Sequence, residues 1–375
     1  MRKSRLEDIS YYPSFRVPVS SLPPYSYVGV EHLVKDRGGV CLSPNMPNAD
    51  SAIQFRPRDI LIGNIRPYLK KIWLADITGG ASGDVIVVRI RDEYKDSITP
   101  DYLYKVLSSD QFFAYDNLNT KGAKMPRGDK KAIAAYLIPI PSIEEQKSIV
   151  DELDLLTGII DKKNAQLRDL DALSQAIFYE MFGNNMSFWP SYKLGDICDT
   201  TSGGTPSKSH PEYYLNGTIP WLRSGEVEGT NITNTEIKIT DLGVKYSSAK
   251  WFPAQTVVVA MYGATVGEVG ILGKPMTTNQ AVCGILPNDS FRPLYLYSWF
   301  RSKKRDFVEQ AAGGAQPNIS QNIIRNAKIC CPPLDVQDSY VERLASIEEQ
   351  KMIIDCSLKQ IQYLLDSRMD HYFNE

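Results

Sequence analysis

The chain has few of the residues from which compact catalytic or metal centres are built. Only three histidines, His32, His210 and His371, occur in 375 residues, and none has the spacing of a metal site or a catalytic triad. The six cysteines include no Cys-x-x-Cys pair, which argues against a zinc site and against a disulfide framework. Free thiols are typical of a reducing compartment, so we expect a cytoplasmic protein.

Nucleotide-binding motifs are missing as well. No Gly-x-Gly-x-x-Gly follows a predicted strand, so nothing indicates a dinucleotide or methyl-donor pocket. Residues 267–274 (GEVGILGK) resemble a phosphate loop, but the first glycine is absent and Pro275 replaces Ser or Thr. An Asp…Glu-x-Lys nuclease triad would have to use Glu236 and Lys238, but no partner carboxylate is convincingly placed in the sequence. We therefore expect no catalytic residue, no metal and no cofactor in this chain.

Long apolar runs and an excess of one charge are also lacking. No segment has eighteen uninterrupted apolar residues, and no apolar run follows the basic N-terminal residues, so neither membrane spanning nor secretion is expected. The net charge of −2 decides nothing about a polyanionic partner, because phosphate is bound by local positive potential. With 43% hydrophobic residues, the chain has enough apolar material for two globular domains.

The sequence contains one unit twice. The stretches IPIPSIEEQ from Ile138 and ICCPPLDVQ from Ile329 introduce two similar long segments, and aligning Gln146 with Gln337 gives an offset of 191 positions. Upstream, the Tyr-Leu-Tyr at 102–104 faces the Tyr-Leu-Tyr at 295–297. Each copy consists of a turn-rich body followed by a long helix with alternating polar and apolar residues.

The two bodies are predicted to mix α and β structure. Short β-branched runs at 85–90 and 256–261 are bounded by Gly, Pro, Asn or Asp, which is typical of strands. Segments 101–114 and 293–311 have helical spacing and no interior Pro or Gly. The expected fold class is therefore α+β, with two mixed α/β bodies, two long coiled-coil helices and an internal repeat.

The two tails predict long helices that pair through an apolar seam with the three-and-four spacing of a coiled coil. The residues expected to pair are Ile149, Leu153, Leu156, Ile160, Leu167 and Leu170 in the first helix, and Leu344, Ile347, Ile354, Leu358, Ile361 and Leu365 in the second. Ser142 and Glu145 predict a capping box at the start of the first helix, and Gly183 its end. The expected boundaries are 1–141 and 184–332 for the bodies and 142–183 and 333–375 for the helices.

Interruptions of the two seams do not coincide. At the 191-residue offset, Ile160 faces Lys351, whereas Ser174 faces Leu365. Complementary interruptions of this kind allow two different helices to fix their partner and direction. A helix of roughly 40 residues is about 60 Å long, so we interpret the pair as a spacer. A general coiled-coil dimerisation element fits the periodicity equally well.

Basic, aromatic and amide residues in predicted loops are the candidates for binding nucleic acid. Residues 121–131 hold five basic residues and one acid, which suits contacts to phosphate, and Asn, Gln and Arg can also bind base edges. The predicted binding residues are Arg66, Tyr68, Lys70, Lys71, Lys121, Lys124, Arg127, Thr205, Lys208, Arg223, Tyr262, Asn279, Gln280, Lys303, Lys304, Gln316 and Asn318. Each of them also suits an ordinary turn or a solvated helix end.

Several stretches together resemble the DNA specificity subunit of type I restriction-modification systems. They are TSGGTPSKSHPEYYLNGTIPWLRSGEV from Thr201, RPRDILIGNIRPYLKK from Arg56, GAQPNIS from Gly314, and the IPIPSIEEQ and CPPLDVQD entries to the long helices. The resemblance covers practically the whole chain. The first body departs from it, since it lacks the Thr-Ser-Gly-Gly-Thr-Pro stretch.

The resemblance implies a non-catalytic reader of double-stranded DNA. Each body would be a target recognition domain for one half of a bipartite sequence. The helices would pair antiparallel, set the spacer between the half-sites and dock two modification (methyltransferase) subunits. Those partners would bind S-adenosylmethionine and methylate adenine, and motor-nuclease restriction subunits would join for cleavage.

Two other functions are compatible with parts of the sequence. A site-specific DNA endonuclease or modification enzyme would need its own active site, for which no motif is present. A coiled-coil assembly adaptor would account for the long helices, but it predicts no DNA sequence preference and no need for two different bodies.

Overall fold

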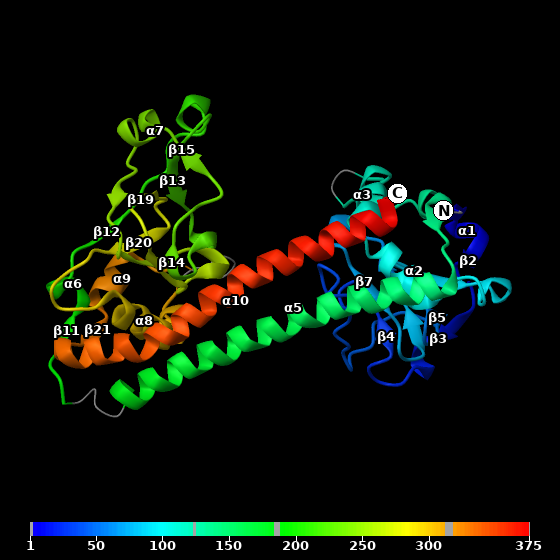
Figure 1. The fold of residues 1–375 in the computed structure, drawn as a ribbon, viewed down its shortest axis with the longest axis horizontal. Coiled ribbons are helices and arrows are strands. Elements are labelled where there is room, and N and C mark those ends of the chain that lie inside the picture. Colours follow the sequence, from blue (N-terminus) through cyan, green and yellow to red (C-terminus); the bar gives the residue numbers. More distant parts are fainter. Residues whose placement is uncertain (1–2, 123–124, 184–187, 312–317, 375) are drawn as a thin grey trace. The chain divides into compact units, whose positions relative to one another are not determined.

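The computed structural model describes residues 3–122, 125–183, 188–311 and 318–374, and Figure 1 shows its helices and strands. The chain divides into two compact units. The first unit combines residues 1–163 with residues 357–375, and the second unit is residues 164–356. Both long helices therefore contribute residues to both units.

The described part of the first unit contains two four-stranded sheets and one strand pair. One sheet has the antiparallel order β2-β9-β6-β7, the other has the order β3-β5-β8-β4 with β4 and β8 parallel, and β1 pairs with β10. The strands are β1 (Lys3–Arg5), β2 (Ser10–Tyr11), β3 (Arg16–Pro18), β4 (Tyr27–Val28), β5 (Ser51–Phe55), β6 (Ile60–Gly63), β7 (Ile72–Leu74), β8 (Gly79–Ala81), β9 (Val85–Ile90) and β10 (Leu137–Pro139). The strand predicted at 85–90 is thus confirmed as β9.

Short helices cover these sheets. They are α1 (Leu6–Ile9), η1 (Val19–Ser21), η2 (Pro67–Leu69), η3 (Asp92–Tyr94), α2 (Pro100–Leu107), α3 (Asp110–Leu118) and α4 (Lys130–Ala135). The prediction of one helix over 101–114 was wrong. Ser109 adopts an extended conformation (φ −68°, ψ 153°), and its hydroxyl accepts from the Phe112 N–H, which starts α3 as a new helix.

In the second unit, the described strands form a five-stranded sheet, a four-stranded sheet and a strand pair. Their orders are β12-β20-β17-β18-β14, β15-β13-β19-β16 and β11-β21. The strands are β11 (Ser191–Lys193), β12 (Thr200–Ser202), β13 (Ile219–Leu222), β14 (Gly229–Ile232), β15 (Lys238–Ile239), β16 (Trp251–Phe252), β17 (Val257–Ala260), β18 (Val269–Leu272), β19 (Met276–Thr278), β20 (Val282–Ile285) and β21 (Lys328–Cys330). The strand predicted at 256–261 corresponds to β17.

Besides its share of the two long helices, this unit contains several short helices and the longer α8. They are α6 (Leu194–Ile197), η5 (Pro211–Tyr213), η6 (Ser224–Glu226), α7 (Asp241–Lys245), η7 (Gly263–Thr265), α8 (Pro293–Glu309) and α9 (Gln321–Asn326). Phe182 lies at the end of the central helix with its ring 4.9 Å from that of Tyr295 and 5.2 Å from that of Tyr340. The helix predicted at 293–311 is confirmed as α8.

Two long helices dominate the secondary structure, as the sequence predicted. They are α5 (Ile143–Phe178), which continues as the π-helical segment η4 (Tyr179–Gly183), and α10 (Leu334–Asn374) (Figure 1). The predicted capping box is present, because the Glu145 N–H donates to Ser142 Oγ at 3.2 Å and the Ser142 N–H donates to Glu145 Oε2 at 2.9 Å.

A buried glutamine anchors the first turn of each long helix to its body. Both side-chain amides are fully engaged, since each nitrogen donates to two backbone carbonyls and each oxygen accepts one backbone N–H. The partners are the Ser97 and Pro141 carbonyls and the Thr99 N–H for Gln146, and the Ser290 and Pro332 carbonyls and the Arg292 N–H for Gln337. The two glutamines aligned from the sequence thus make the same kind of contact in the two units.

In the part of the chain that the structure describes, the six cysteines form no disulfide with one another, and Cys41 and Cys356 are exposed. Across the described ranges, no helix combines the length and the apolar character needed to cross a membrane. The same residues contain no cluster of three or more His, Cys, Asp or Glu side chains placed to hold a metal ion.

Candidate nucleic-acid interface

In the first unit, the chain turns sharply after β6 and presents an arginine and a tyrosine. Arg66 and Lys70 flank η2 with φ angles of 53° and 49°, in the left-handed region. Tyr68 between them is 52% exposed. The Arg66 side chain is exposed, and no carboxylate among the described residues pairs with it. The turn therefore offers a cation and an aromatic ring to a ligand.

The segment before α4 lies beside this turn. The Arg66 N–H donates to the Pro126 carbonyl at 2.8 Å, and Ile65 forms a β-bridge with Arg127. A second bridge joins Lys121 to Arg127. The fold thus gathers Arg66, Lys121 and Arg127 from two separate segments of sequence. The predicted Lys124 falls outside the described residues.

Two carboxylates accompany these cations. Lys121 Nζ lies 2.6 Å from Asp129 Oδ2, and Arg127 Nη2 lies 3.1 Å from Asp84 Oδ1. The hydrogen bond from Lys121 lowers the pKa of Asp129 below its usual value. Ion pairs this exposed contribute little to stability, so a phosphate or a base can compete for the cation.

Lys70 and Lys71 make contacts within the fold instead. Lys70 Nζ lies 2.7 Å from Asp110 Oδ1, which also contacts Arg37. Burial acts to raise the pKa of Asp110, but the hydrogen bonds from Lys70 and Arg37 outweigh it and lower the pKa. Lys71 Nζ donates to the Val30 carbonyl at 2.7 Å. Of the basic residues predicted in this turn, Arg66 is the one whose charged group has no partner among the residues that the structure describes.

A buried carboxylate that the sequence analysis missed lies beneath this surface. Asp116 on α3 is 1% exposed, and neither of its oxygens has a hydrogen-bond partner among the described residues; the same holds for Asn64 Oδ1. Burial raises the pKa of Asp116 to about 6. Gly128 packs directly on it, since a Cβ there would lie 2.5 Å from Asp116 Oδ1. Asp116 lies four residues after the buried Phe112 on α3, and this spacing is the signal that could have indicated its burial.

In the second unit, a tightly held glycine pair presents Thr205. A Cβ on Gly203 would lie 2.1 Å from the Thr278 carbonyl oxygen, so a larger residue has no room there. Trp221 Nε1 donates to the Gly204 carbonyl at 3.0 Å and holds the turn from the other side. The Thr205 hydroxyl then donates to Gln280 Oε1. The backbone thus fixes Thr205, which in turn orients the Gln280 amide.

Tyr262 and Asn318 adjoin the same region. After β17, the Met261 N–H donates to the Ala281 carbonyl at 2.8 Å, and the Ile319 N–H donates to the Met261 carbonyl at 2.9 Å. Tyr262, which is 44% exposed, forms a β-bridge with Asn318. Gln280 directly precedes Ala281, and its side chain accepts from Thr205. Four of the predicted residues, Thr205, Tyr262, Gln280 and Asn318, therefore belong to segments that are joined by hydrogen bonds or by the β-bridge.

The remaining predicted residues of this unit are engaged elsewhere or stand apart. Asn279 Oδ1 accepts from the Ala281 N–H, Arg223 pairs with Glu226 and Glu236, Lys303 pairs with Asp306, Lys304 pairs with Glu268, and Lys208 is exposed. The Glu226 hydrogen bond raises the pKa of Arg223. The basic residues of α8 thus have the character of a solvated, ion-paired helix. Gln316 is not among the described residues.

Sequence reasoning also missed two residues on α9 that support this surface. Gln321 Nε2 donates to the Thr200 carbonyl at 2.9 Å, and Arg325 Nη1 donates to Thr200 Oγ1 at 3.1 Å. They hold β12, which leads into the glycine pair. These contacts join residues more than a hundred positions apart, and no local pattern predicts them.

The residues predicted to pair the long helices are at least partly buried. Ile149, Leu153, Leu156, Leu344 and Ile347 are buried, and Ile160, Leu167, Leu170, Ile354, Leu358, Ile361 and Leu365 are half-buried. Direct contacts between α5 and α10 are polar as well as apolar. In the first unit, Arg368 of α10 donates to both carboxylate oxygens of Glu152, at 2.5 and 3.0 Å.

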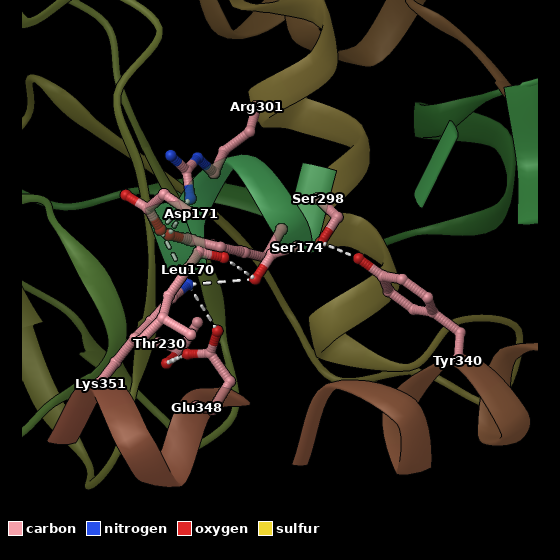
Figure 2. A network of polar contacts seen from close by, with 10 residues as sticks. Leu170, Asp171, Ser174, Thr230, Ser298, Arg301, Tyr340, Glu348 and Lys351 are labelled. Carbon is pink, nitrogen blue, oxygen red and sulfur yellow. Dashed lines mark hydrogen bonds and ion pairs between the residues drawn. The ribbon is translucent and has the colours of Figure 1, made fainter. Parts of the chain in front are cut away.

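In the second unit, a polar layer lies between the two helices, and Figure 2 shows it. The Lys351 side chain, 13% exposed, places Nζ 2.8 Å from Asp171 Oδ1 and 2.9 Å from Glu348 Oε1. Arg301 also reaches Asp171, at 3.1 Å. Burial acts to lower the pKa of Lys351, but the two carboxylates outweigh it and raise the pKa. Further along, Arg343 pairs with Glu180 at 3.2 Å, so the helices run antiparallel in this unit.

A family model described as "Type I restriction modification DNA specificity domain" matches residues 73–169 and 186–362. The chain belongs to this family. The suspected resemblance is therefore confirmed. The match runs from Trp73 in β7 to Asp169 in α5 and also includes most of the second unit.

Relatives named as specificity subunits agree with this membership. The chain is 28% identical over 253 residues to the type I restriction enzyme EcoR124I/EcoR124II specificity subunit of Escherichia coli, covering 62% of each chain. It is 25% identical over 379 residues to the MjaVIII specificity subunit of Methanocaldococcus jannaschii, covering 91% of this chain and 85% of the relative. The match thus spans less than two thirds of the E. coli relative.

A solved structure has a similar fold. The crystal structure of a type I restriction-modification S subunit from M. genitalium superposes with a TM-score of 0.56 at 13% identity, covering 99% of this chain and 96% of that chain. At this identity the similarity concerns the fold alone. It agrees with a mixed α/β protein that contains a long central helix and a long C-terminal helix.

Proposed function

We propose that this chain is the DNA-reading specificity subunit of a type I restriction-modification complex. The bodies predicted at 1–141 and 184–332 would each read one half of a bipartite target in double-stranded DNA. The helix pair formed by α5 and α10 would set the spacer between the halves. Cations such as Arg66 and Lys121 would contact phosphates and position each body, while other side chains read base edges.

One observation carries this proposal: the two units present different side chains on the same backbone arrangement. The residue after β6 and the residue after β17 each donate to the carbonyl of the residue just before the paired strand, β9 or β20. Each also accepts from the segment before α4 or α9. The first unit places Arg66, Lys121 and Arg127 there, and the second places Tyr262, Gln280 and Asn318. Two copies of one unit with different polar groups suit two different base sequences. The matching glutamine anchors support an internal duplication.

The chemistry would come from partner subunits. We infer that this chain is not itself an enzyme and acts in the cytoplasm, with two modification subunits that bind S-adenosylmethionine and methylate adenine. Motor-nuclease restriction subunits would join them for cleavage. Exposed apolar side chains of α10, namely Met352, Ile353, Tyr363 and Leu364, are candidates for burial against such partners.

Methylation mapping tests the proposal directly. The chain would be expressed with its modification subunit in cells without adenine methylation, and methylated positions would be found by single-molecule sequencing. A chimaeric chain would carry residues 184–332 of a relative in place of its own. We expect a split motif, of which only one half changes on the exchange.

Any of three results would contradict it. One continuous methylated motif would mean that the two bodies do not read separate half-sites. A stable complex without sequence-specific methylation would favour an assembly adaptor, and DNA cleavage by the purified chain with magnesium alone would favour an enzyme with its own active site.

A further inference from the structure

The two candidate surfaces differ in charge at corresponding positions. In the first unit, the Asn64 N–H donates to the Asp84 carbonyl at 2.9 Å, and the Gly128 N–H donates to the Asn64 carbonyl at 3.1 Å. Met261 makes the same two bonds in the second unit, to Ala281 and from Ile319. Asp84 therefore corresponds to Ala281, and Arg127, just before Gly128, corresponds to Asn318.

The first unit presents a charged donor and a charged acceptor side by side. The Arg127 side chain is 53% exposed and that of Asp84 is 40% exposed, with Nη2 and Oδ1 3.1 Å apart. Within the described ranges, this contact leaves further guanidinium N–H groups and carboxylate lone pairs unused. An ion pair this exposed is weak, so both groups can turn towards a base pair at little cost.

These two groups match one base pair in the major groove. Guanine presents the acceptors O6 and N7, to which arginine donates two hydrogen bonds, and cytosine presents an N4 amino group, from which a carboxylate accepts. A neighbouring arginine and aspartate are therefore complementary to G·C. Facing A·T, the guanidinium would meet the adenine amino group, a donor, in place of one acceptor.

The second unit presents neutral groups instead. Gln280 is exposed, and its Oε1 accepts from the Thr205 hydroxyl, which leaves both Nε2 hydrogens and a second Oε1 lone pair available. A glutamine amide matches the adenine N6 and N7 edge with one donor and one acceptor. Thr205 fixes which end of the amide faces which way, so it is a positioning residue.

We propose that the first unit reads a G·C pair with Arg127 and Asp84, and that the second unit reads an A·T pair with Gln280 oriented by Thr205. This inference rests on the proposed function and adds the base class read by each unit. It also gives Arg127 a part in base reading, whereas the sequence alone suggested phosphate contact for the whole 121–131 loop.

Base analogues that lack N7 test the assignment. The complete complex with its modification subunits would be bound to duplexes of the mapped target, with 7-deazaguanine or 7-deazaadenine placed singly in either half. We expect one 7-deazaguanine position to weaken wild-type binding about 5- to 150-fold and to have no effect on Arg127→Ala. One 7-deazaadenine position in the other half should behave in the same way with Gln280→Ala.

Matched variants separate base reading from general effects. Arg58→Ala removes another exposed arginine of the first unit, paired with Asp101, and should leave the penalty for 7-deazaguanine intact. Thr205→Val should weaken discrimination against 7-deazaadenine while non-specific DNA binding is kept.

The outcomes distinguish this inference from the function on which it rests. The base assignment is overturned by a split motif in which the half read by the first unit needs no G·C pair. It is also overturned if Arg127→Ala weakens binding equally on all sequences and remains sensitive to 7-deazaguanine. Both results leave the specificity-subunit function standing. The absence of any split motif overturns both.

Discussion

Asp116 is a buried residue whose ionisation affects the stability of the first unit. Its pKa is raised to about 6 by burial, from 3.8 in an unfolded chain, so the folded protein binds the proton more tightly. The contribution to stability is therefore favourable at low pH and is lost as pH rises through 6. Above that pH the folded state holds a buried charge without a described partner.

We predict that Asp116→Asn increases the free energy of unfolding by about 1–3 kcal/mol at pH 8 and by almost nothing at pH 4. Urea unfolding at the two pH values measures this difference. Asp151→Asn, an exposed aspartate on α5, is the matched control and should show no such pH dependence. Destabilisation by Asp116→Asn at pH 8 would mean that the carboxylate is paired in the protein.

Gln146 and Gln337 hydrogen-bond the first turn of each long helix to the body that precedes it. Replacing either by Leu leaves two carbonyls and one N–H without their side-chain partner, and an unpaired buried group costs about 1–3 kcal/mol. We predict a loss of about 2–4 kcal/mol for each variant, since water will reach some of these groups. Thermal unfolding compares them with Gln166→Leu, an exposed glutamine of α5 that should change stability little. Equal stability of all three variants would exclude an anchoring role.

At the scale of elements, Lys351 links α10 to Asp171 of α5 in the second unit. Removing its charge by Lys351→Met leaves Asp171 with Arg301 alone and Glu348 with Thr230 alone (Figure 2). We predict a loss of about 1–3 kcal/mol, because breaking a largely buried ion pair leaves an uncompensated charge. The double variant Lys351→Met, Glu348→Leu should recover most of it, since it removes the carboxylate that Lys351→Met leaves without a cation and keeps the pair between Asp171 and Arg301.

Crosslinking then tests whether the layer specifies register. With single cysteines placed on α5 and α10 of the double variant, and the native cysteines replaced, we expect additional crosslinked pairings beside the native one. A double variant that stays less stable than Lys351→Met, or that keeps one pairing only, would contradict a role for this layer in specifying the register.

Elements whose signals are local were predictable from the sequence. The capping box at Ser142 and Glu145, strand β9 and the lengths of α5 and α10 depend on nearby residues and were predicted correctly. The break between α2 and α3 was missed, because the helical spacing of the apolar residues continues through Ser109, whose hydroxyl caps α3 in the structure. Periodicity cannot show which serine will cap a new helix.

The candidate surface was only partly predictable for a different reason. Residue type suggested Thr205 and Gln280 separately, but their hydrogen bond joins positions 75 apart and depends on the tight packing of Gly203. Lys71 has the same charge as Arg66, yet it donates to the Val30 carbonyl and is half-buried. Which polar groups remain free for a ligand is decided by tertiary contacts.

At the scale of the whole molecule, each long helix begins on one unit and ends in the other. Helix α5 starts at the Gln146 anchor of the first unit and leads to Phe182, which packs on Tyr295 of the second. Helix α10 starts at the Gln337 anchor of the second unit and ends at Phe373, whose ring lies 5.9 Å from that of Tyr102 in the first. Both units therefore depend on both helices for their cores.

This arrangement leads to a prediction about the length of the DNA spacer. Seven helical residues inserted after Lys163 and seven after Cys356 preserve the heptad seam and lengthen each helix by about 10.5 Å. At 3.4 Å per base pair, the methylated motif should keep both half-sites and gain about 3 bp of spacer. Methylation should also slow, because those base pairs rotate one half-site about the DNA axis relative to the other.

Methylation sequencing of the double insertion measures the spacer directly, and a single insertion after Lys163 serves as the control. The single insertion shifts α5 against α10 and separates Glu152 from Arg368, so we expect it to lose methylation altogether. An unchanged spacer in the double insertion would mean that the helices hold partners without setting the distance between half-sites. A spacer lengthened in proportion would show that helix length, and not the bodies, determines how far apart the two halves of the target lie.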